Sequence, residues 1–244
     1  MKKLLFGAAA LGLLVGAAQA QEMTIRIGTE GAYPPFNFIN DAGEVDGFER
    51  ELGDRICEIA DLKCSWVTTD WDSIIPNLVS GNFDMLMAGM TITEEREEVI
   101  GFSEAYLPPA PSLYIALAGT EPDVETGVIA VQVNTIQASY VAESGATLVE
   151  FTNADETISA LRSGEADAVL FDADYLLPVV EESGGEIVVI GEPISIGEGI
   201  AVGLRQRDTD LKDKVDAVIG SMKEDGSLNE MITRWFGEDA PVWE

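Results

Sequence analysis

The alternation of apolar and polar positions predicts short strands separated by helices. Residues 25–29, Ile-Arg-Ile-Gly-Thr, and 128–132, Val-Ile-Ala-Val-Gln, are predicted to form strands. Each run is followed by apolar positions at helical spacing, near residues 49–59 and 136–143. Strands that alternate with helices in this order are typical of an α/β fold.

An internal repeat relates the two halves of the chain. Residues 72–89 and 155–172 align without a gap, and in each copy a short helix would end at a glycine before a short apolar strand. Such strands are buried on both faces, as in a parallel sheet. The repeat therefore predicts two similar lobes. The identical pairs are Asp72/Asp155, Ile75/Ile158, Leu78/Leu161, Ser80/Ser163, Gly81/Gly164 and Asp84/Asp167.

Two segments rich in proline and glycine are expected to connect the lobes. Leu107-Pro-Pro-Ala-Pro111 cannot continue a helix or a central strand, so we expect the chain to cross at residues 108–111. The Gly-rich residues 191–199 are expected to carry it back. The expected division is a first lobe of residues 21–108 and 199–244, ending in helices near 211–222 and 228–235, and a second lobe of residues 111–193.

The first twenty residues have the pattern of a secretory signal peptide. Met1-Lys2-Lys3 is positively charged, an uncharged apolar run follows, and Ala18-Gln19-Ala20 is a small-x-small cleavage site. The alternative is an uncleaved membrane anchor, but the run is shorter than the roughly 20 residues that span a bilayer. There is no cysteine near the cleavage site, so the sequence does not indicate a lipid anchor. We therefore expect export to the periplasm or beyond.

Composition excludes several classes of function. The chain has 14 Lys and Arg against 44 Asp and Glu, a formal charge of −30, and no histidine. The lack of histidine excludes histidine triads and histidine-ligated zinc or haem, and the acids show no calcium-loop pattern, so we expect no metal. Such acidity disfavours nucleic acids and anionic membranes as partners. The acids are spread along the chain, which favours solubility or a saline habitat over attraction of cationic ligands.

Cys57 and Cys64 are the only cysteines, so only one disulfide can form within the chain. Cys57 lies near the end of the predicted helix 49–59, and Cys64 begins a predicted strand at residues 64–68. An oxidising compartment favours a bond that joins the helix to this strand. Two buried free thiols remain the alternative.

Polar and small residues gather at the carboxyl ends of the predicted strands. In open α/β sheets, ligands bind beyond these ends, so two facing lobes would form a cleft lined by them. The aromatic residues Tyr33, Phe36 and Trp71 could wall such a cleft, although core packing explains each of them equally well. The residues at strand ends are Glu30, Ala88, Gly89, Thr91, Gln132, Thr135 and Asp172.

Two charged residues suit the two ends of a zwitterion. Arg96 follows the Thr93 hydroxyl at a predicted helix start, which suits a carboxylate; alternatively, Arg96 pairs with neighbouring glutamates. Asp172 ends a buried strand and needs a cationic partner, either a ligand ammonium or a protein arginine. Together they describe a site for a free α-amino acid.

With these features the chain resembles the periplasmic solute-binding proteins for polar amino acids, the lysine/arginine/ornithine-, histidine- and glutamine-binding group of ABC uptake systems. The likeness covers residues 23–236. It implies two Rossmann-like α/β lobes joined by a two-segment hinge, the type II periplasmic-binding-protein fold. The motifs that carry it are Ile27-Gly-Thr-Glu-Gly-Ala-Tyr-Pro-Pro-Phe36, Gly47-Phe-Glu-Arg-Glu-Leu52, Trp71-Asp-Ser-Ile-Ile-Pro-Asn-Leu78, Met90-Thr-Ile-Thr-Glu-Glu-Arg96, Phe102-Ser103 and Asp167-Ala-Val-Leu-Phe-Asp172.

The resemblance implies a residue set for each part of the ligand. Arg96 and Thr91 would hold the carboxylate, helped by the Gly89 backbone and by second-lobe residues from Thr135 to Gln137. The α-ammonium would contact Asp172 and the Ala88 carbonyl, and Tyr33 and Trp71 would enclose the side chain. The basic-amino-acid binders also carry a disulfide where Cys57 and Cys64 fall. The ten residues implied to contact ligand are Glu30, Tyr33, Trp71, Ala88, Gly89, Thr91, Arg96, Thr135, Gln137 and Asp172.

The sequence departs from the family pattern at four places. Glu30 replaces the family's aspartate, Ala88-Gly89 replaces a pair of small polar residues, and Asn134-Thr-Ile136 replaces Gly-Thr-Thr. Gly-Phe-Glu-Arg-Glu at residues 47–51 replaces Gly-Phe-Asp-x-Asp. These differences concern the ligand's identity more than its class.

The leading hypothesis is a monomeric binding protein, without a cofactor, that delivers an amino acid to the membrane subunits of an ABC permease. The runner-up is an enzyme like the periplasmic cyclohexadienyl dehydratase, with Glu30 or Asp172 as general acid. No second catalytic group has a persuasive spacing. A third possibility, the sensing half of a receptor, is disfavoured because no later segment is long and apolar enough to span a membrane.

Overall fold

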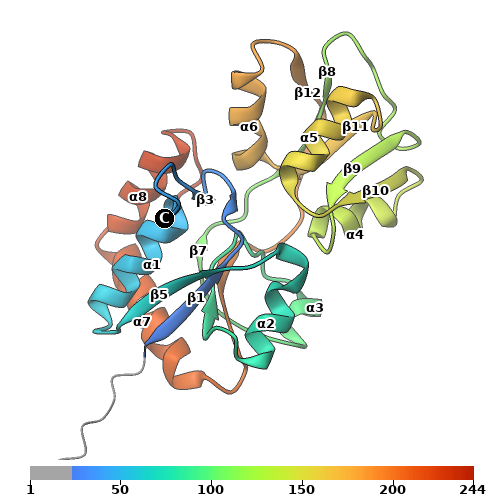
Figure 1. Cartoon of the computed structure of the whole chain (residues 1–244). Coiled ribbons are helices and arrows are strands. Elements are labelled where there is room, and N and C mark those ends of the chain that lie inside the picture. The colour runs from blue at the N-terminus through green and yellow to red at the C-terminus, as the bar shows by residue number, and fades with distance from the viewer. Residues whose placement is uncertain (1–23) are drawn as a thin grey trace, which may run out of the picture.

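A computed structural model describes residues 24–244 as two α/β lobes (Figure 1). Each lobe contains a five-stranded sheet with helices packed against it. The predicted two-lobed α/β architecture is therefore confirmed. The predicted signal peptide, residues 1–20, lies outside the described residues. No helix within the described part of the chain is both long and apolar enough to cross a membrane.

The first lobe takes its sheet from both ends of the chain, in the order β5-β1-β6-β13-β7. These strands are β1 (Ile25–Thr29), β5 (Cys64–Thr68), β6 (Met85–Leu86), β7 (Gly101–Leu107) and β13 (Ile200–Leu204). A small sheet of β2 (Ala32–Tyr33), β3 (Asn37–Ile39) and β4 (Val45–Asp46) follows β1. The helices are α1 (Phe48–Ile59), α2 (Ile74–Ser80), α3 (Glu94–Glu97), α7 (Thr209–Glu224) and α8 (Ser227–Phe236). β1 runs parallel to β5 and β6, and β13 runs antiparallel to β6 and β7.

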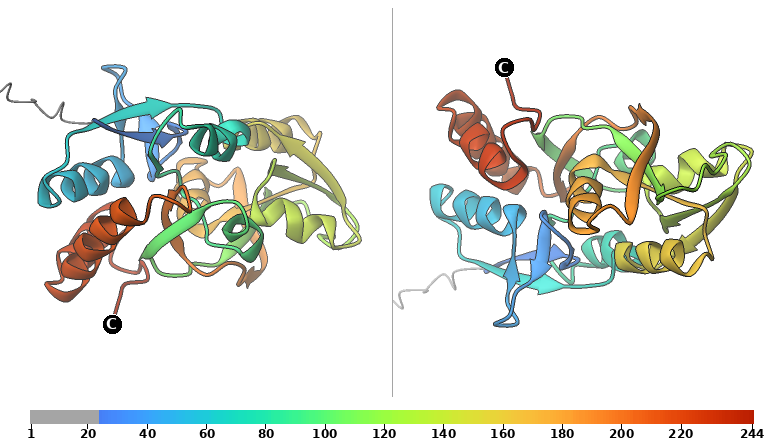
Figure 2. Two further views of the ribbon diagram at one scale, coloured as in Figure 1. Left: turned by 90° about the horizontal axis from the view of Figure 1, so that it is seen from below. Right: turned by 90° about the horizontal axis from the view of Figure 1, so that it is seen from above.

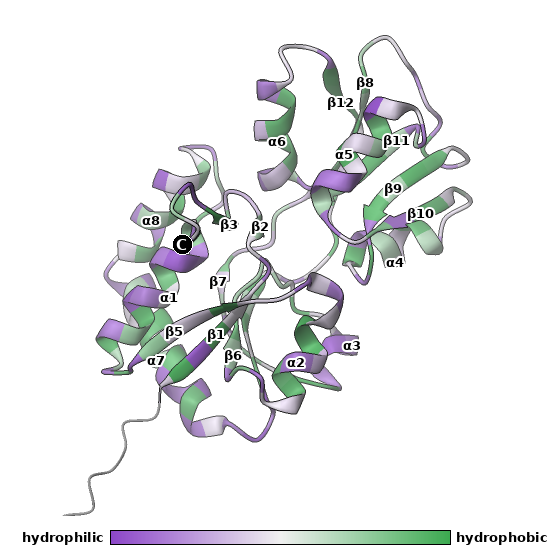
Figure 3. Ribbon diagram, viewed as in Figure 1, coloured by the Kyte–Doolittle hydropathy of each residue, from purple (hydrophilic) through white to green (hydrophobic). Residues whose placement is uncertain are grey.

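The second lobe repeats this plan with the order β10-β9-β11-β8-β12. Its strands are β8 (Ser112–Leu117), β9 (Val128–Gln132), β10 (Thr147–Phe151), β11 (Ala168–Asp172) and β12 (Ile187–Ile194), and its helices are α4 (Ile136–Ala142), α5 (Ala154–Ser163) and α6 (Ala173–Glu182). β9 runs parallel to β10 and β11, and β8 runs antiparallel to β11 and β12. The strands are the most apolar elements and the helices carry polar outer faces (Figure 3), as expected for sheets covered by amphipathic helices.

The internal repeat has the same structural role in both lobes. Asp84 Oδ2 accepts a hydrogen bond from the Arg26 backbone N–H at 3.0 Å, and Asp167 Oδ2 accepts one from the Val128 N–H at 2.8 Å. Each aspartate thus ties the start of its own strand to the first strand of its lobe. The preceding helices end at glycines in the left-handed region, with φ of 84° at residue 81 and 77° at residue 164, as the pattern predicts.

The chain crosses between the two sheets twice. The first crossing is the proline-rich segment 108–111, between β7 and β8. The second is shorter than the predicted 191–199, because β12 continues to Ile194, which pairs with Ser112 of β8. β12 is an edge strand and its register shifts after Ile190, and an edge position with a bulge tolerates Pro193. The second crossing therefore spans residues 195–199.

The C-terminal helices return to the first lobe, as predicted. α7 packs against β7 and α1, and α8 lies beside α1 (Figure 2). Glu51 of α1 accepts hydrogen bonds from Arg234 at 2.6 Å and from the Trp235 indole N–H at 2.8 Å. These contacts join the last helix to the first one.

The disulfide between Cys57 and Cys64 is present. It joins the last turn of α1 to the start of β5. The alternative of two free thiols is therefore wrong.

Candidate functional site

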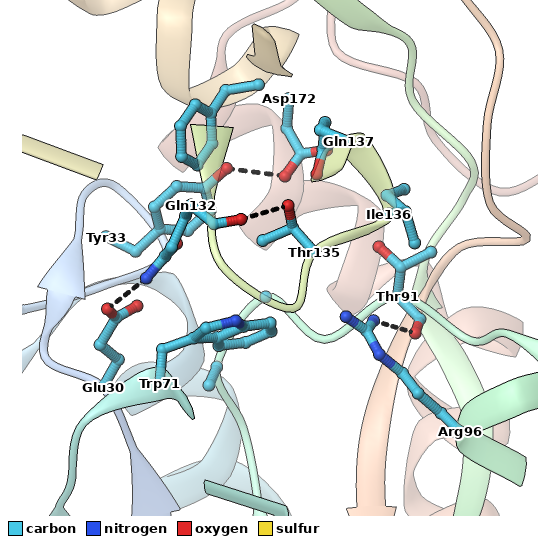
Figure 4. Close-up of a pocket in the computed structure, with 13 residues that line it drawn as sticks. Glu30, Tyr33, Trp71, Thr91, Arg96, Gln132, Thr135, Ile136, Gln137 and Asp172 are labelled. Atoms are coloured by element: carbon cyan, nitrogen blue, oxygen red, sulfur yellow. Dashed lines mark hydrogen bonds between the residues drawn. The ribbon is translucent and has the colours of Figure 1, made fainter. Parts of the chain in front are cut away.

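A cavity of about 330 Å³, including the part open to solvent, lies between the two lobes (Figure 4). All ten residues that the resemblance implied line it. The first lobe contributes loops that follow β1 and β6 and the start of α3, and the second contributes the ends of β9 and β11 and the start of α4. The lining consists of Glu30, Tyr33, Trp71, Ala88, Gly89, Thr91, Arg96, Gln132, Thr135, Ile136, Gln137, Phe171 and Asp172. Their role in binding stays a prediction.

Arg96 lies at the wall of this cavity in a short helix. Thr93 caps the helix by accepting a hydrogen bond from the Arg96 backbone N–H at 3.2 Å, as predicted. The guanidinium donates to the Thr91 carbonyl at 2.7 Å and to the Asn134 carbonyl at 3.1 Å, and its carbon lies 5.5 Å from the centre of the Trp71 ring. Burial lowers the pKa of Arg96 to about 10, so it remains cationic at neutral pH.

The alternative that Arg96 pairs with glutamates of its own helix is not observed in residues 24–244. Two of its five N–H groups donate to backbone carbonyls, which leaves the others available to an anion. Thr91, beside it, is only 8% exposed, and its hydroxyl has no hydrogen bond within the described residues. The pair can therefore offer several donors to a carboxylate.

Asp172 ends β11 on the opposite lobe and is held by neutral donors. Its carboxylate accepts hydrogen bonds from the Tyr33 hydroxyl at 2.6 Å and from the Gln137 side chain at 2.7 Å. Within the described residues it makes no ion pair, so the expected cationic partner is not a protein arginine in contact with it. Burial raises the pKa of Asp172, whereas the hydrogen bonds from Tyr33 and Gln137 and the positive charge of Arg96 lower it.

Tyr33 and Trp71 are both buried more deeply than side chains that only wall a cleft. The Tyr33 ring stacks on Phe36 at 5.1 Å and on Tyr175 at 4.7 Å between ring centres. The Trp71 indole N–H donates to the Val133 carbonyl of the other lobe at 2.8 Å. Each residue therefore combines the two interpretations that the sequence left open, core packing and cavity lining.

Glu30 lies at another side of the cavity, beside the second lobe. Its carboxylate accepts a hydrogen bond from the Gln132 side chain at 2.7 Å, and Gln132 also donates to the Thr152 carbonyl at 3.1 Å. Burial raises the pKa of Glu30 to about 7, and the negative charges of Asp70, Glu49 and Asp155 act in the same direction. This part of the cavity is therefore strongly negative when Glu30 is ionised.

Gly89 and Thr135 use their polar groups to maintain the site. The Gly89 N–H donates to Glu49 Oε1 at 2.6 Å, so it points away from the cavity, and a Cβ on this residue, whose φ is 61°, would lie 3.3 Å from the Tyr33 ring. The Thr135 hydroxyl donates to the Gln132 carbonyl at 2.7 Å and caps α4 by accepting from the Ala138 N–H at 3.1 Å. Both groups already have partners, which makes their predicted ligand contacts weaker candidates than those of Arg96 and Asp172.

The model of the bacterial extracellular solute-binding proteins, family 3, matches residues 25–238. The chain belongs to this family. Membership accounts for the two lobes, the double crossing and a cavity between them. It also agrees with the resemblance drawn from the sequence motifs.

Similar proteins match most of the chain. The lysine/arginine/ornithine-binding periplasmic protein of Escherichia coli (strain K12) is 30% identical, over 93% of this chain and 95% of that protein. A crystal structure of a periplasmic His/Glu/Gln/Arg/opine family-binding protein from Silicibacter pomeroyi, in complex with lysine, is 61% identical with a TM-score of 0.88 over 90% of this chain and 100% of that one. An ancestral amino-acid-binding protein, a precursor of cyclohexadienyl dehydratase, is 29% identical with a TM-score of 0.78, over 87% of this chain and 95% of that one.

Three lining residues of this family 3 protein were not predicted as site residues. Gln132 was placed at a strand end but given no role, and its contact with Glu30 depends on how the lobes face each other. Phe171 is an apolar neighbour of Asp172, and that position is the only signal that could have found it; Ile136 falls inside the implied range 135–137 but is not one of the ten named residues.

Proposed function

We propose that the protein binds a free α-amino acid with a cationic side chain between its lobes and delivers it to the membrane subunits of an ABC importer. The observation that carries this proposal is the pair Arg96 and Asp172, which come from opposite lobes and line one cavity. Arg96 with Thr91 suits the α-carboxylate, and Asp172 suits the α-ammonium. The lobes would close on this zwitterion about the segments 108–111 and 195–199.

The preference for a cationic side chain is supported by charge. Glu30 lines the cavity, and Asp70, Glu49 and Asp155 add negative potential there, whereas Arg96 is the only cationic residue among residues 24–244 that lines it. A neutral side chain would leave this potential without compensation. The 61% identical relative was crystallised with lysine, which agrees with this choice.

We propose the periplasm as the compartment. The signal-peptide pattern of residues 1–20 supports export, and the disulfide suits an oxidising environment. The Escherichia coli relative is named as a periplasmic protein. A monomer would suffice, because a single chain supplies both sides of the cavity.

The proposed binding of a cationic amino acid is tested by native mass spectrometry of freshly purified protein. Calorimetric titration with lysine, arginine, ornithine, histidine, glutamine and a sugar then follows. We expect the basic amino acids to bind most tightly and the sugar not to bind. Binding of none of the amino acids would refute the proposed function.

An enzymatic role is the second candidate, because a carboxyl with a pKa of about 7, such as Glu30, can act as a general acid. Similarity to the dehydratase precursor adds to this candidate. We favour binding, since Glu30 is held by Gln132 and no second acid–base group lies in contact with it among the described residues. Incubation with prephenate or arogenate should give no product. Turnover of either compound would favour the enzymatic role over the binding role.

Replacement of Glu30 by Gln should change selectivity and pH dependence together. We expect lysine affinity to fall by about 10- to 100-fold, and glutamine affinity by less than about threefold, because only lysine loses an ion pair. In the unaltered protein, lysine should bind more tightly as the pH rises from about 6 to 8, since Glu30 ionises near its pKa of about 7. In Glu30→Gln this pH dependence should disappear.

Calorimetry at several pH values checks this prediction, and Glu44→Gln is the matched control because it removes an exposed carboxylate of the same lobe. Glu44→Gln should leave both affinities and the pH profile unchanged. Equal loss of lysine and glutamine affinity in Glu30→Gln would refute charge pairing.

Trp71→Phe should weaken the closed arrangement of the lobes. The change keeps an aromatic ring but removes the hydrogen bond to the Val133 carbonyl. One hydrogen bond contributes about 0.5–1.5 kcal/mol, so affinity should fall by about 2- to 12-fold for every ligand, whatever its charge. Trp66→Phe is the control, because the Trp66 indole donates to Asp54 at 2.9 Å on the outside of the first lobe. A loss that is equal in both variants would argue against closure by Trp71.

A further inference from the structure

A carboxylate without solvent contact lies directly behind the cavity. Glu49, in the first turn of α1, has no exposed surface, and neither has Asn37, which contacts it. Glu49 does not line the cavity itself. Burial of a charged group is costly unless it is fully hydrogen-bonded, so its partners indicate what it does.

Glu49 is bonded to the loop that carries Ala88 and Gly89. Its Oε1 accepts the Gly89 N–H at 2.6 Å and also the hydroxyl of the fully buried Tyr106. Gly89 is held against the Tyr33 ring, so the position of this loop also fixes how close the Tyr33 ring can approach. Tyr106 stands on β7, one residue before the end of the strand that leads into the first crossing.

Glu49 is also bonded, through Asn37, to the loop that carries Glu30. Its Oε2 accepts the Asn37 side-chain N–H at 2.7 Å, and Asn37 Oδ1 accepts the Gly31 N–H at 2.6 Å. Gly31 follows Glu30 directly, so the backbone that presents the Glu30 carboxylate is tied to Glu49. One buried side chain thus connects the Glu30–Gly31 loop with the Ala88–Gly89 loop.

The charge of Glu49 acts on the same site. All three of its partners donate hydrogen bonds, an arrangement that suits an ionised carboxylate, and its place in the first turn of α1 puts it near the positive end of the helix. Burial alone raises the pKa of Glu49, and these three donors oppose that effect. Its charge in turn contributes to the raised pKa of Glu30.

We propose that Glu49 is a positioning residue whose bonds and buried charge set both first-lobe loops in the arrangement that favours a cationic ligand. The inference rests on the proposed function. Glu49 is one methylene longer than the aspartate that the family pattern has in this motif, and it reaches Gly89 and Asn37 with separate oxygens. Substitutions can therefore distinguish the effect of the side chain's length from the effect of its charge.

The test compares Glu49→Gln and Glu49→Asp by calorimetric titration with lysine and glutamine at pH 6, 7 and 8. Glu49→Gln should lower lysine affinity by about tenfold or more and glutamine affinity by less, and it should move the pH midpoint of lysine binding downwards, because a negative neighbour of Glu30 is lost. Glu49→Asp keeps the charge, so the midpoint should stay while the lysine-to-glutamine affinity ratio falls by about threefold or more.

Ser103→Ala is the matched control. Ser103 is buried in the same lobe, donates to the Glu104 carbonyl at 2.7 Å and accepts from the Val202 N–H at 3.0 Å, and does not line the cavity. Its loss should lower thermal stability without changing the affinity ratio or the midpoint. A purely structural role of Glu49 would give the same result as this control.

An unchanged affinity ratio and an unchanged midpoint in Glu49→Gln would overturn the inference while leaving the proposed function intact. If Glu49→Gln does not fold, an unchanged ratio in Glu49→Asp overturns it. If the unaltered protein binds lysine with a pH midpoint but the variants match Ser103→Ala, only the role of Glu49 fails. If the unaltered protein binds no amino acid, the proposed function itself fails, and this inference with it.

Discussion

Replacement of Arg96 by Met should abolish measurable amino-acid binding. A carboxylate that loses its guanidinium partner inside a closed cavity loses charge-assisted hydrogen bonds and remains buried without compensation. Breaking such a pair costs about 3–5 kcal/mol, which corresponds to a loss of roughly 100- to 5000-fold in affinity. Calorimetric titration with lysine, and thermal unfolding with and without lysine, would measure this loss.

Two further variants separate binding from folding. Arg162→Met removes an arginine from the surface of the second lobe, where it pairs with Glu186 at 3.2 Å, and should leave affinity unchanged. Arg96→Lys keeps a positive charge but cannot make paired parallel bonds, so its affinity should lie between those of the other two. Affinity that is unchanged in Arg96→Met would remove Arg96 from the site.

Asp172→Asn should give the second largest loss, and the loss should depend on the ligand's α-ammonium. We expect lysine affinity to fall by about 100-fold, because the buried ammonium loses its countercharge. The compound 6-aminohexanoate is lysine without the α-amino group. It should bind the unaltered protein more weakly than lysine does, and Asp172→Asn should change its affinity by less than about threefold.

This comparison identifies the contact and not only the residue. A variant that merely disturbed the bonds to Tyr33 and Gln137 would weaken both ligands alike. Equal losses for lysine and 6-aminohexanoate would therefore contradict pairing of Asp172 with the α-ammonium.

Much of the fold could be predicted because burial leaves a clear pattern in short parallel strands. β1, β5 and β9 have the predicted bounds. The repeat located the second lobe, and the rule that ligands bind at the carboxyl ends of strands brought seven strand-end residues to one cavity, whereas the set of ten came from the resemblance.

The contacts across the cavity could not be predicted, because they depend on how two separately folded lobes face each other. The bonds from Trp71 to Val133 and from Gln132 to Glu30 each join residues far apart in the sequence. The glycine and proline of residues 191–194 are typical of loops, and only the edge position of β12 allows a strand there.

The burial of Glu49 was hidden for a different reason. In the sequence it follows Phe48 at the start of an amphipathic helix, where a glutamate is ordinary at a solvated first turn. Its role becomes visible only when Gly89, forty positions later, is folded over it.

The hydrogen bonds that hold Asp172 lead us to expect discrimination between ammonium and hydroxyl groups. Each of its oxygens already receives a hydrogen bond from an uncharged group, and each still has a lone pair to spare. A ligand hydroxyl would therefore add only another neutral hydrogen bond to Asp172. A ligand ammonium would add a full positive charge without displacing the Tyr33 or Gln137 hydrogen bond. On this basis we expect sugars and alcohols to bind weakly even without a steric barrier that excludes them.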